Sequence, residues 1–397
     1  MSVTFPRGFR ASGVVAGMKP SRRRDLGLLV VDGEASAAGL FTTNAFAAAP
    51  VELARKRIIG GSARAAVVNS GQANAGTGSR GLEDAERTTG EVAGALGLAP
   101  DGVIPCSTGV IGEPIHLDEY LAALPELTRG LSEHGGDAFA QAIMTTDTVP
   151  KTAAAERDGV RVGGCAKGVG MIAPDLRLAT MLAFVTIDAR VATEHVRRLA
   201  SEVLEPRFES LSVDGCTSTN DTVLLLASGA GGGEPVAPGT AAWTSLTDAL
   251  VEVADSLLQQ LARDAEGGHH VVLITVEGAE TEADARRAAK AIADSPLVKT
   301  AVFGGDPNPG RILQAIGSSG ARFEPSRVRA WLGDVPVIED GAIAPPYFDG
   351  AFEAAHAALA GRDVEIRVRL GDGDGSSTAL GVDLSYGYVK INAEYHT

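Results

Sequence analysis

The sequence predicts a mixed α/β protein built from two domains, and three observations lead to this expectation. The chain has 397 residues, which is more than a single hydrophobic core usually organises. Short apolar segments with β-branched residues alternate along it with segments of helical periodicity. A Gly- and Pro-rich stretch at 229–242 separates two such series. We therefore expect one domain over residues 1–240 and a second over residues 241–397.

The first domain is expected to alternate strands and helices. Strands are predicted where apolar runs are bounded by glycine or other turn residues, and helices where apolar residues recur every three or four positions. The expected strands are 26–33, 63–71, 103–112, 181–187 and 221–229. The expected helices are 81–97, 117–127, 137–144 and 192–208. The ERDG at 156–159 predicts a hairpin turn.

The second domain is expected to open with an amphipathic helix over residues 245–268. Ser245 and Asp248 have the spacing of a capping box, and Gly267 suits the end of the helix. The later predicted elements are a strand at 270–278, a helix opened by Thr281, and strands at 297–305, 364–373 and 384–392. This order predicts a β-α-β arrangement extended by antiparallel strands.

Composition argues against two broad classes of function. The formal net charge of −15 opposes generic nucleic-acid binding, which needs a basic surface. The longest apolar runs are far shorter than the ~20 residues of a membrane span. The opening MSVTFPRGFRASG contains no apolar secretory segment, and Cys106, Cys165 and Cys216 are scattered. These features predict a cytoplasmic protein with free thiols and with no membrane or nucleic-acid partner.

Common catalytic and metal-binding motifs do not account for a site. The GVGMIA at 168–173 fits the loosest dinucleotide-binding pattern, but Pro174 prevents the helix that a Rossmann turn requires. The GDGDG at 371–375 lacks the later glycine and glutamate of a calcium loop. The adjacent His269 and His270 would point to opposite faces of a strand. We expect no metal and no organic cofactor, while a Ser-His-Asp triad remains open because no pattern selects one.

One hydroxyl stands where a glycine-spaced loop meets a buried strand. Thr180 lies between Ala179 and Met181, after KGVGMIAPDLRL and before the apolar run LAFVTI. A threonine at this position can be present simply for its β propensity. It can also attack the preceding carbonyl, and an N-to-O acyl shift followed by hydrolysis would free its α-amine. That amine, with a pKa of about 7.7–8.0, could serve as the base for its own hydroxyl.

A series of segments, in order over nearly the whole chain, resembles the glutamate N-acetyltransferase (ornithine acetyltransferase) family of arginine biosynthesis. The segments are FTTN and AAPV within 41–51, NSGQANAGTG, MTTDTVPK, AKGVGMIAPD, ATMLAFVTIDA, TSTNDTVLLLASG, DAEG, SPLVKTAVFGGDPN with GR after one intervening residue, and NAEYHT. Each fragment alone is weak, but this many in order is a specific signal. The resemblance favours the nucleophile interpretation of Thr180.

The resemblance implies a fold and an activity. It implies a four-layer αββα sandwich with an N-terminal-nucleophile-like site, plus a smaller C-terminal α/β domain whose tail returns to that site. It implies self-cleavage between Ala179 and Thr180, an α₂β₂ assembly of the two fragments, and transfer of acetyl from N2-acetyl-L-ornithine to L-glutamate. Whether acetyl-CoA is also a donor stays open, as does the choice between primary arginine synthesis and a specialised pathway.

The resemblance also implies roles for individual residues. Thr180 would take the acetyl group, and Thr108 with Gly109 would form the oxyanion hole. The residues implied to bind substrate are Thr145, Lys167, Thr180, Glu266, Asn392 and Thr397. A hydroxyl and a backbone N–H suit a developing oxyanion, while Lys167 and Glu266 suit a carboxylate and an ammonium group.

The chain departs from the family pattern at three places. Arg177 and Leu178 are extra residues immediately before the predicted cut. Pro309 stands where the family has an aromatic residue, and AEGGHH replaces a Thr-Lys pair after the acidic residue. These departures concern cleavage efficiency and substrate choice. Two alternatives therefore stay open: a self-processing aminopeptidase or amidase that passes the acyl group to water, and an uncleaved, non-catalytic relative.

Overall fold

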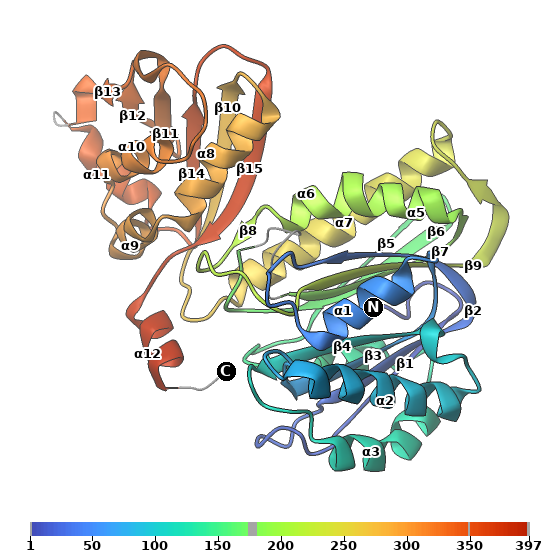
Figure 1. The fold of residues 1–397 in the computed structure, drawn as a ribbon. Helices are drawn as coiled ribbons and strands as arrows, with labels where there is room; N and C mark the ends of the chain where they lie inside the picture. The colour runs from blue at the N-terminus through green and yellow to red at the C-terminus, as the bar shows by residue number, and fades with distance from the viewer. Residues whose placement is uncertain (1, 174–180, 348–349, 395–397) are drawn as a thin grey trace.

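The protein is described by a computed structural model covering residues 2–173, 181–347 and 350–394. It confirms the mixed α/β class, since helices flank two mixed β-sheets. Figure 1 shows the larger sheet at the lower right, with helices above and below its strands, and the C-terminal domain at the upper left. Within the described ranges, no helix is both long enough and apolar enough to cross a bilayer.

The first domain is built on a sheet of eight strands in the described chain, ordered β4-β3-β2-β9-β7-β6-β5 with β1 also paired to β2. Its strands are β1 (Phe9–Val14), β2 (Leu26–Phe41), β3 (Ser62–Gln72), β4 (Val103–Val110), β5 (Lys151–Arg157), β6 (Val160–Lys167), β7 (Leu182–Val191) and β9 (Thr222–Val236). The long β2 pairs with β1 through its first part and with β9 through Ser36–Phe41. It therefore passes from one half of the sheet to the other, and the two halves stack.

The helices of this domain are α1 (Ala49–Ile58), α2 (Gly78–Leu96), α3 (Leu117–Arg129), α4 (Gly136–Ala142), α5 (Thr193–Leu199), α6 (Glu205–Phe208) and α7 (Ala241–Arg263). Short helical turns lie at η1 (Pro100–Gly102) and η2 (Ala200–Leu204). The Asp158-Gly159 pair has positive φ at both positions and closes the predicted β5–β6 hairpin.

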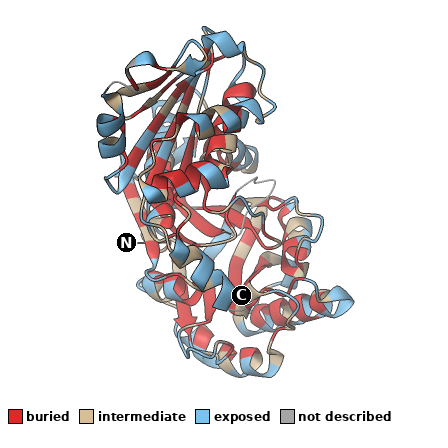
Figure 2. Ribbon diagram, turned by 90° about the vertical axis from the view of Figure 1, so that its left-hand side faces the viewer, coloured by how far each residue is buried: buried red, intermediate tan, exposed pale blue. Residues whose placement is uncertain are grey.

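Alternate side chains along the strands form three cores, which makes the domain a four-layer αββα sandwich. Leu182 and Phe184 of β7 face the other half of the sheet, where they share a core with Leu29 of β2. Ala183 and Val185 face outward, into a core that includes residues of α5 and α7. The opposite face of β2 and β3 packs on α2 and α3. Figure 2 shows the strands largely in red, as buried, with exposed residues concentrated on the outer helices.

The second domain contains a seven-stranded sheet within the described residues, ordered β13-β12-β11-β14-β10-β15-β8. Its strands are β8 (Leu211–Ser212), β10 (Val271–Ala279), β11 (Arg329–Leu332), β12 (Val335–Glu339), β13 (Ala342–Ile343), β14 (Asp363–Arg369) and β15 (Gly375–Val382). The helices are α8 (Glu282–Asp294), α9 (Pro296–Gly304), α10 (Pro309–Gly317), α11 (Ala351–Ala358) and α12 (Tyr386–Glu394), with turns η3 (Pro325–Arg327) and η4 (Pro345–Tyr347). As predicted, Thr281 caps α8 by accepting from the Asp284 amide.

Packing places α7 with the sandwich, beyond the predicted boundary at residue 240. Its N-cap is Thr240, which accepts from the Trp243 amide, so the helix begins before the predicted capping box. The Ser245 hydroxyl instead donates to Asp158. The Gly-rich stretch is also largely strand, because β9 continues to Val236. We infer that the boundary between the domains follows α7 and precedes β10.

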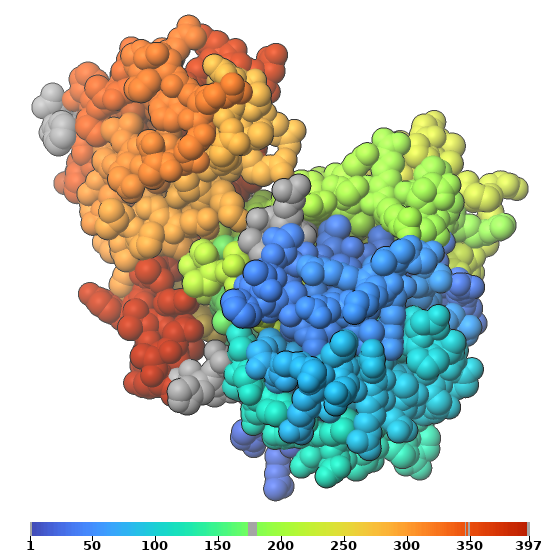
Figure 3. Space-filling view, viewed as in Figure 1, coloured from blue at the N-terminus to red at the C-terminus, as the bar shows by residue number. Residues whose placement is uncertain are grey.

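Two predicted strands are helices. Residues 297–304 lie in α9 and Gly305 caps its end, because Pro296 occupies the first turn and the Ser295 side chain caps the Val298 amide. Residues 384–392 mostly form α12, which leaves the second domain and lies beside the first (Figures 1 and 3). Tyr386 and Val389 are exposed there, so the alternating pattern does not reflect a buried sheet face.

Candidate active site

A cavity of about 1310 Å³ lies where the first domain meets the segments leading to and from the second. Its walls come from the loop after β1, the ends of β3, β4 and β6, the segments 145–148, 218–220 and 263–268, and α12. Six of the predicted site residues line it: Thr108, Gly109, Thr145, Lys167, Glu266 and Asn392. Residues distant in the sequence therefore share one cavity.

Thr108 and Gly109 lie at the end of β4, where it runs parallel to β3. Gly109 has a φ of 128°, and a Cβ at this position would overlap the carbonyl group of Gly71. Only glycine fits this turn. The buried Thr108 hydroxyl oxygen accepts a hydrogen bond from Lys167 Nζ at 2.9 Å. Because that bond uses the oxygen as acceptor, the Thr108 O–H proton remains available to an oxyanion.

Lys167 is a buried cation at the end of β6, with a relative exposure of 3%. Within the described ranges, no carboxylate oxygen lies within 4.0 Å of its Nζ atom. Burial lowers the pKa of Lys167, although the carboxylates of Asp147, Asp221 and Glu266 partly offset this effect. A buried ammonium facing a cavity with only a hydroxyl partner is suited to an anionic ligand.

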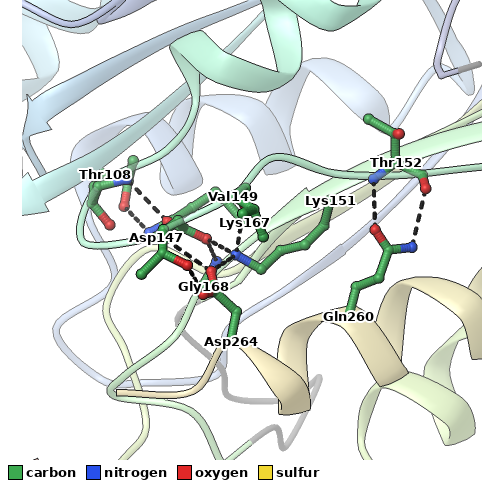
Figure 4. Close-up of polar contacts among 11 residues, drawn as sticks. Thr108, Asp147, Val149, Lys151, Thr152, Lys167, Gly168, Gln260 and Asp264 are labelled. Atoms are coloured by element: carbon green, nitrogen blue, oxygen red, sulfur yellow. Dashed lines mark hydrogen bonds and ion pairs between the residues drawn. The ribbon is translucent and has the colours of Figure 1, made fainter. Parts of the chain in front are cut away.

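A second buried lysine nearby has its charge fully matched (Figure 4). Lys151 Nζ donates to Asp147 Oδ1 at 2.6 Å and to Asp264 Oδ2 at 2.5 Å. Burial alone would raise the pKa of Asp147, but Lys167 and Lys151 outweigh it and hold that pKa below its usual value. Asp147 also accepts from the Thr145 and Gly168 amides at 3.0 and 2.9 Å. The network thereby fixes the backbone beside both Thr145 and Lys167.

Glu266 and Asn392 meet across the cavity wall. Asn392 Nδ2, on α12, donates to Glu266 Oε2 at 2.9 Å. The Glu266 amide donates to the Val169 carbonyl at 2.8 Å, and a Cβ on Gly170 would overlap the Glu266 carboxylate. The C-terminal helix thus contributes the Asn392 side chain to the cavity wall.

The predicted cleavage site, Ala179 and Thr180, lies outside the described residues, as do Arg177, Leu178 and Thr397. The described residues on either side of 174–180 are held by carboxylates. Asp221 Oδ1 accepts from the Met181 amide, and Asp214 accepts from the Met171 and Ile172 amides at 2.6 and 2.9 Å. Burial raises the pKa of Asp221 well above its usual value.

Sequence reasoning missed Asp147, Asp221 and the Lys151 network. Both aspartates lie in segments that carry the family resemblance, MTTDTVPK and TSTNDTV, so a signal was present. The i, i+4 spacing of Asp147 and Lys151 was also visible. The third member, Asp264, is more than a hundred positions away, and only the fold brings it to Lys151. The described residues contain no cluster of three or more His, Cys, Asp or Glu side chains suited to a metal ion.

Comparison with known proteins relates nearly the whole chain to one protein family. Residues 10–397 match the model of the ArgJ family. The arginine biosynthesis bifunctional protein ArgJ of Parasynechococcus marenigrum is 45% identical over 401 residues, covering 100% of this chain and 95% of the relative. The protein of the same name from Thermus thermophilus is 46% identical, with full coverage of both chains. A crystal structure of the Bacillus halodurans protein has 37% identity and a TM-score of 0.51, covering 53% of this chain and 98% of that one.

Proposed function

The chain belongs to the ArgJ family, and from this premise we propose that it transfers acetyl from N2-acetyl-L-ornithine to L-glutamate in arginine biosynthesis. One observation carries the proposal. Lys167, a buried cation without a carboxylate partner in the described structure, lies against Thr108 in a cavity that Glu266 and Asn392 also line. This arrangement offers an anchor for an α-carboxylate and, elsewhere on the same wall, an acceptor for an ammonium group.

We propose that the chain first cuts itself between Ala179 and Thr180. The Thr180 hydroxyl attacks the Ala179 carbonyl, the C–N bond breaks as an ester forms, and water releases the ester to leave Thr180 as a new N-terminus. The length of the Bacillus halodurans chain supports this step, because it corresponds to 53% of the present chain. The fragment 180–397 would likewise hold slightly more than half of the 397 residues.

In the proposed transfer reaction, Lys167 holds the α-carboxylate of acetylornithine and Glu266 holds its side-chain ammonium. The Thr180 hydroxyl attacks the acetyl carbonyl while the α-amine of Thr180 accepts the proton. The Thr108 O–H and the Gly109 N–H stabilise the oxyanion, and ornithine leaves with a proton on its amine. The amine of glutamate then attacks acetyl-Thr180 by the reverse sequence. These steps require no metal or organic cofactor.

Further parts of the proposal concern assembly and donor range. We propose that fragments 1–179 and 180–397 stay together as α₂β₂ in the cytoplasm. Size-exclusion chromatography with light scattering, followed by a denaturing gel, tests the assembly. Replacing acetylornithine by acetyl-CoA in the same assay tests whether the enzyme also acetylates glutamate from that donor.

Product analysis tests the main proposal against its two rivals. The purified protein is incubated with acetylornithine, with and without glutamate, and acetylglutamate, ornithine and acetate are quantified. Transfer predicts ornithine and acetylglutamate in equal amounts when glutamate is present. Acetate formed at the same rate without glutamate would instead identify an amidase. A single uncut band without turnover would identify a non-catalytic relative.

A further inference from the structure

The two proposed substrates have side chains of opposite charge, although both carry an α-carboxylate. Glu266 and Asn392 suit the ammonium group of ornithine, but Glu266 would repel the side-chain carboxylate of glutamate. Lys167 is already assigned to the α-carboxylate that the two substrates share. If the proposed function holds, the cavity needs another cation to bind glutamate.

Lys19, in the loop between β1 and β2, lines the cavity and has the required properties. Its Nζ atom donates to the Met144 carbonyl at 2.5 Å and to the Arg24 carbonyl at 2.9 Å. An ammonium group has three donors, so one donor remains beyond these two bonds. Within the described part of the chain, no carboxylate oxygen lies within 4.0 Å of Lys19 Nζ. Its charge is therefore not matched by an ion pair there.

The position of Lys19 is fixed before any ligand binds. The buried Asp25 carboxylate accepts from the backbone amides of Gly17, Met18 and Lys19 at 3.1, 2.7 and 3.1 Å. Gln72 Nε2, at the end of β3, donates to the Met18 carbonyl at 3.0 Å. The bond to Met144 places the ammonium group next to the segment that begins with Thr145. These hydrogen bonds hold Lys19 in place on the cavity wall.

The remaining Lys and Arg side chains on the described cavity wall are less suited to this task. Arg263 is paired with Asp363 at 2.6 Å. Arg23 and Lys390 are exposed, so water screens their charges and their long side chains would lose entropy on binding. Lys19 combines partial burial, fixed geometry and an unmatched charge.

We propose that Lys19 binds the side-chain carboxylate of L-glutamate and so determines the acyl acceptor. Burial lowers the pKa of Lys19 to about 8, with Lys167 contributing in the same direction and Asp25 and Asp147 opposing it. The lysine is therefore mostly protonated at neutral pH and available to a carboxylate. It can also lose its proton at little cost when the ammonium group of ornithine occupies the cavity, so one site accommodates both substrates in turn.

The test is a comparison of Lys19→Met with Lys56→Met, which removes an exposed lysine on α1 that does not line the cavity. Steady-state kinetics are measured with acetylornithine, glutamate and glutamine, the uncharged analogue of glutamate. Lys19→Met is expected to raise KM for glutamate about ten- to hundred-fold, because a charge-assisted hydrogen bond is lost. KM for acetylornithine should stay within about two-fold of wild type, and the preference for glutamate over glutamine should fall by the same factor as glutamate binding. Lys56→Met should change none of these values.

Two results would overturn the assignment of Lys19 while leaving the proposed function intact. One is an unchanged KM for glutamate in Lys19→Met. The other is an equal rise in KM for both substrates, which would mean that Lys19 helps to bind the shared α-carboxylate or only supports the loop. Lys19→Gln provides a second variant that can still donate to the two carbonyls, and it should show the same selective loss. Absence of transfer by the wild-type enzyme would overturn both proposals.

Discussion

Two buried lysines on neighbouring strands of the sandwich differ in how their charge is balanced. Lys151 begins β5 and forms ion pairs with two carboxylates, whereas Lys167 ends β6 and, among described side chains, hydrogen-bonds only to the Thr108 hydroxyl (Figure 4). The first lysine belongs to a network whose charges balance within the protein. The second carries an unmatched charge at a cavity. Burial alone therefore does not mark a binding residue; what matters is whether the protein itself supplies the counter-charge.

The largest expected effect is on stability and comes from the balanced lysine. Lys151→Met should lower the free energy of unfolding by about 3–5 kcal/mol, because it leaves Asp147 and Asp264 as buried charges without their partner. Urea denaturation measures this change. Arg157→Met is the matched control, since its ion pair with Glu252 is about half exposed and should contribute at most about 1 kcal/mol. Equal, small losses of unfolding free energy in the two variants would show that the buried network of Lys151 is no more important for stability than an exposed ion pair.

The next effect is on turnover, at the hydroxyl that contacts Lys167. Thr108→Val should lower kcat about 10²- to 10³-fold, because the proposed oxyanion donor is lost while the shape of the side chain is kept. Thr89→Val removes another buried hydroxyl, on α2, whose bonds go to helix carbonyls. Its kcat should match wild type. A normal kcat in Thr108→Val would show that this hydroxyl has no role in catalysis.

Lys167→Met should have the opposite signature to Lys151→Met. KM for both acetylornithine and glutamate should rise about ten- to hundred-fold, because the shared carboxylate loses its charged partner. Stability at neutral pH should be unchanged or higher, since a costly buried charge is removed. A stability loss as large as that of Lys151→Met would place Lys167 in the structural network instead.

The pH dependence of stability gives a second measure of the same contrast. Burial lowers the pKa of Lys167 below the ordinary lysine value of 10.5, so the unfolded chain binds this proton more tightly than the folded chain does. The contribution of Lys167 to stability should therefore become less unfavourable as pH rises toward 10.5. Chemical denaturation at several alkaline pH values should show that the free energy of unfolding of wild type rises relative to that of Lys167→Met as pH increases. A constant difference would contradict the lowered pKa.

The smallest effect is expected from the chain end. Asn392→Ala should cost about 0.5–1.5 kcal/mol, or up to roughly ten-fold in kcat/KM for acetylornithine, by removing the bond to Glu266. Removal of residues 392–397 should cost at least as much, while leaving the fold and the cut between Ala179 and Thr180 intact. A truncated, cleaved enzyme with wild-type kcat/KM would show that the tail is dispensable.

The sequence allowed residues of the candidate site to be named, but it did not predict the ion-pair network beside them or the helices within 297–305 and 384–392. Lys167, Glu266 and Asn392 could be named because they lie in short segments with recognisable neighbours. The pairing of Lys151 with Asp264 could not, because it depends on how α7 packs against β5. Segments 297–305 and 384–392 were predicted as strands because short apolar or alternating patterns do not distinguish a strand from a short helix. In the first, the Ser295 cap and Pro296 were local signals for a helix.

We propose that Thr180 carries the acetyl group, and intact mass spectrometry can detect this group on the protein. The purified enzyme is mixed with N2-acetylornithine in the absence of glutamate, quenched in acid and weighed. Two fragments are expected, 1–179 and 180–397, with one acetyl group added to 180–397 only and removed again when glutamate is supplied. Thr180→Ala should remain a single, unmodified chain. Full activity from an uncut wild-type chain, or an active enzyme whose 180–397 fragment never gains the acetyl group, would show that Thr180 does not carry it.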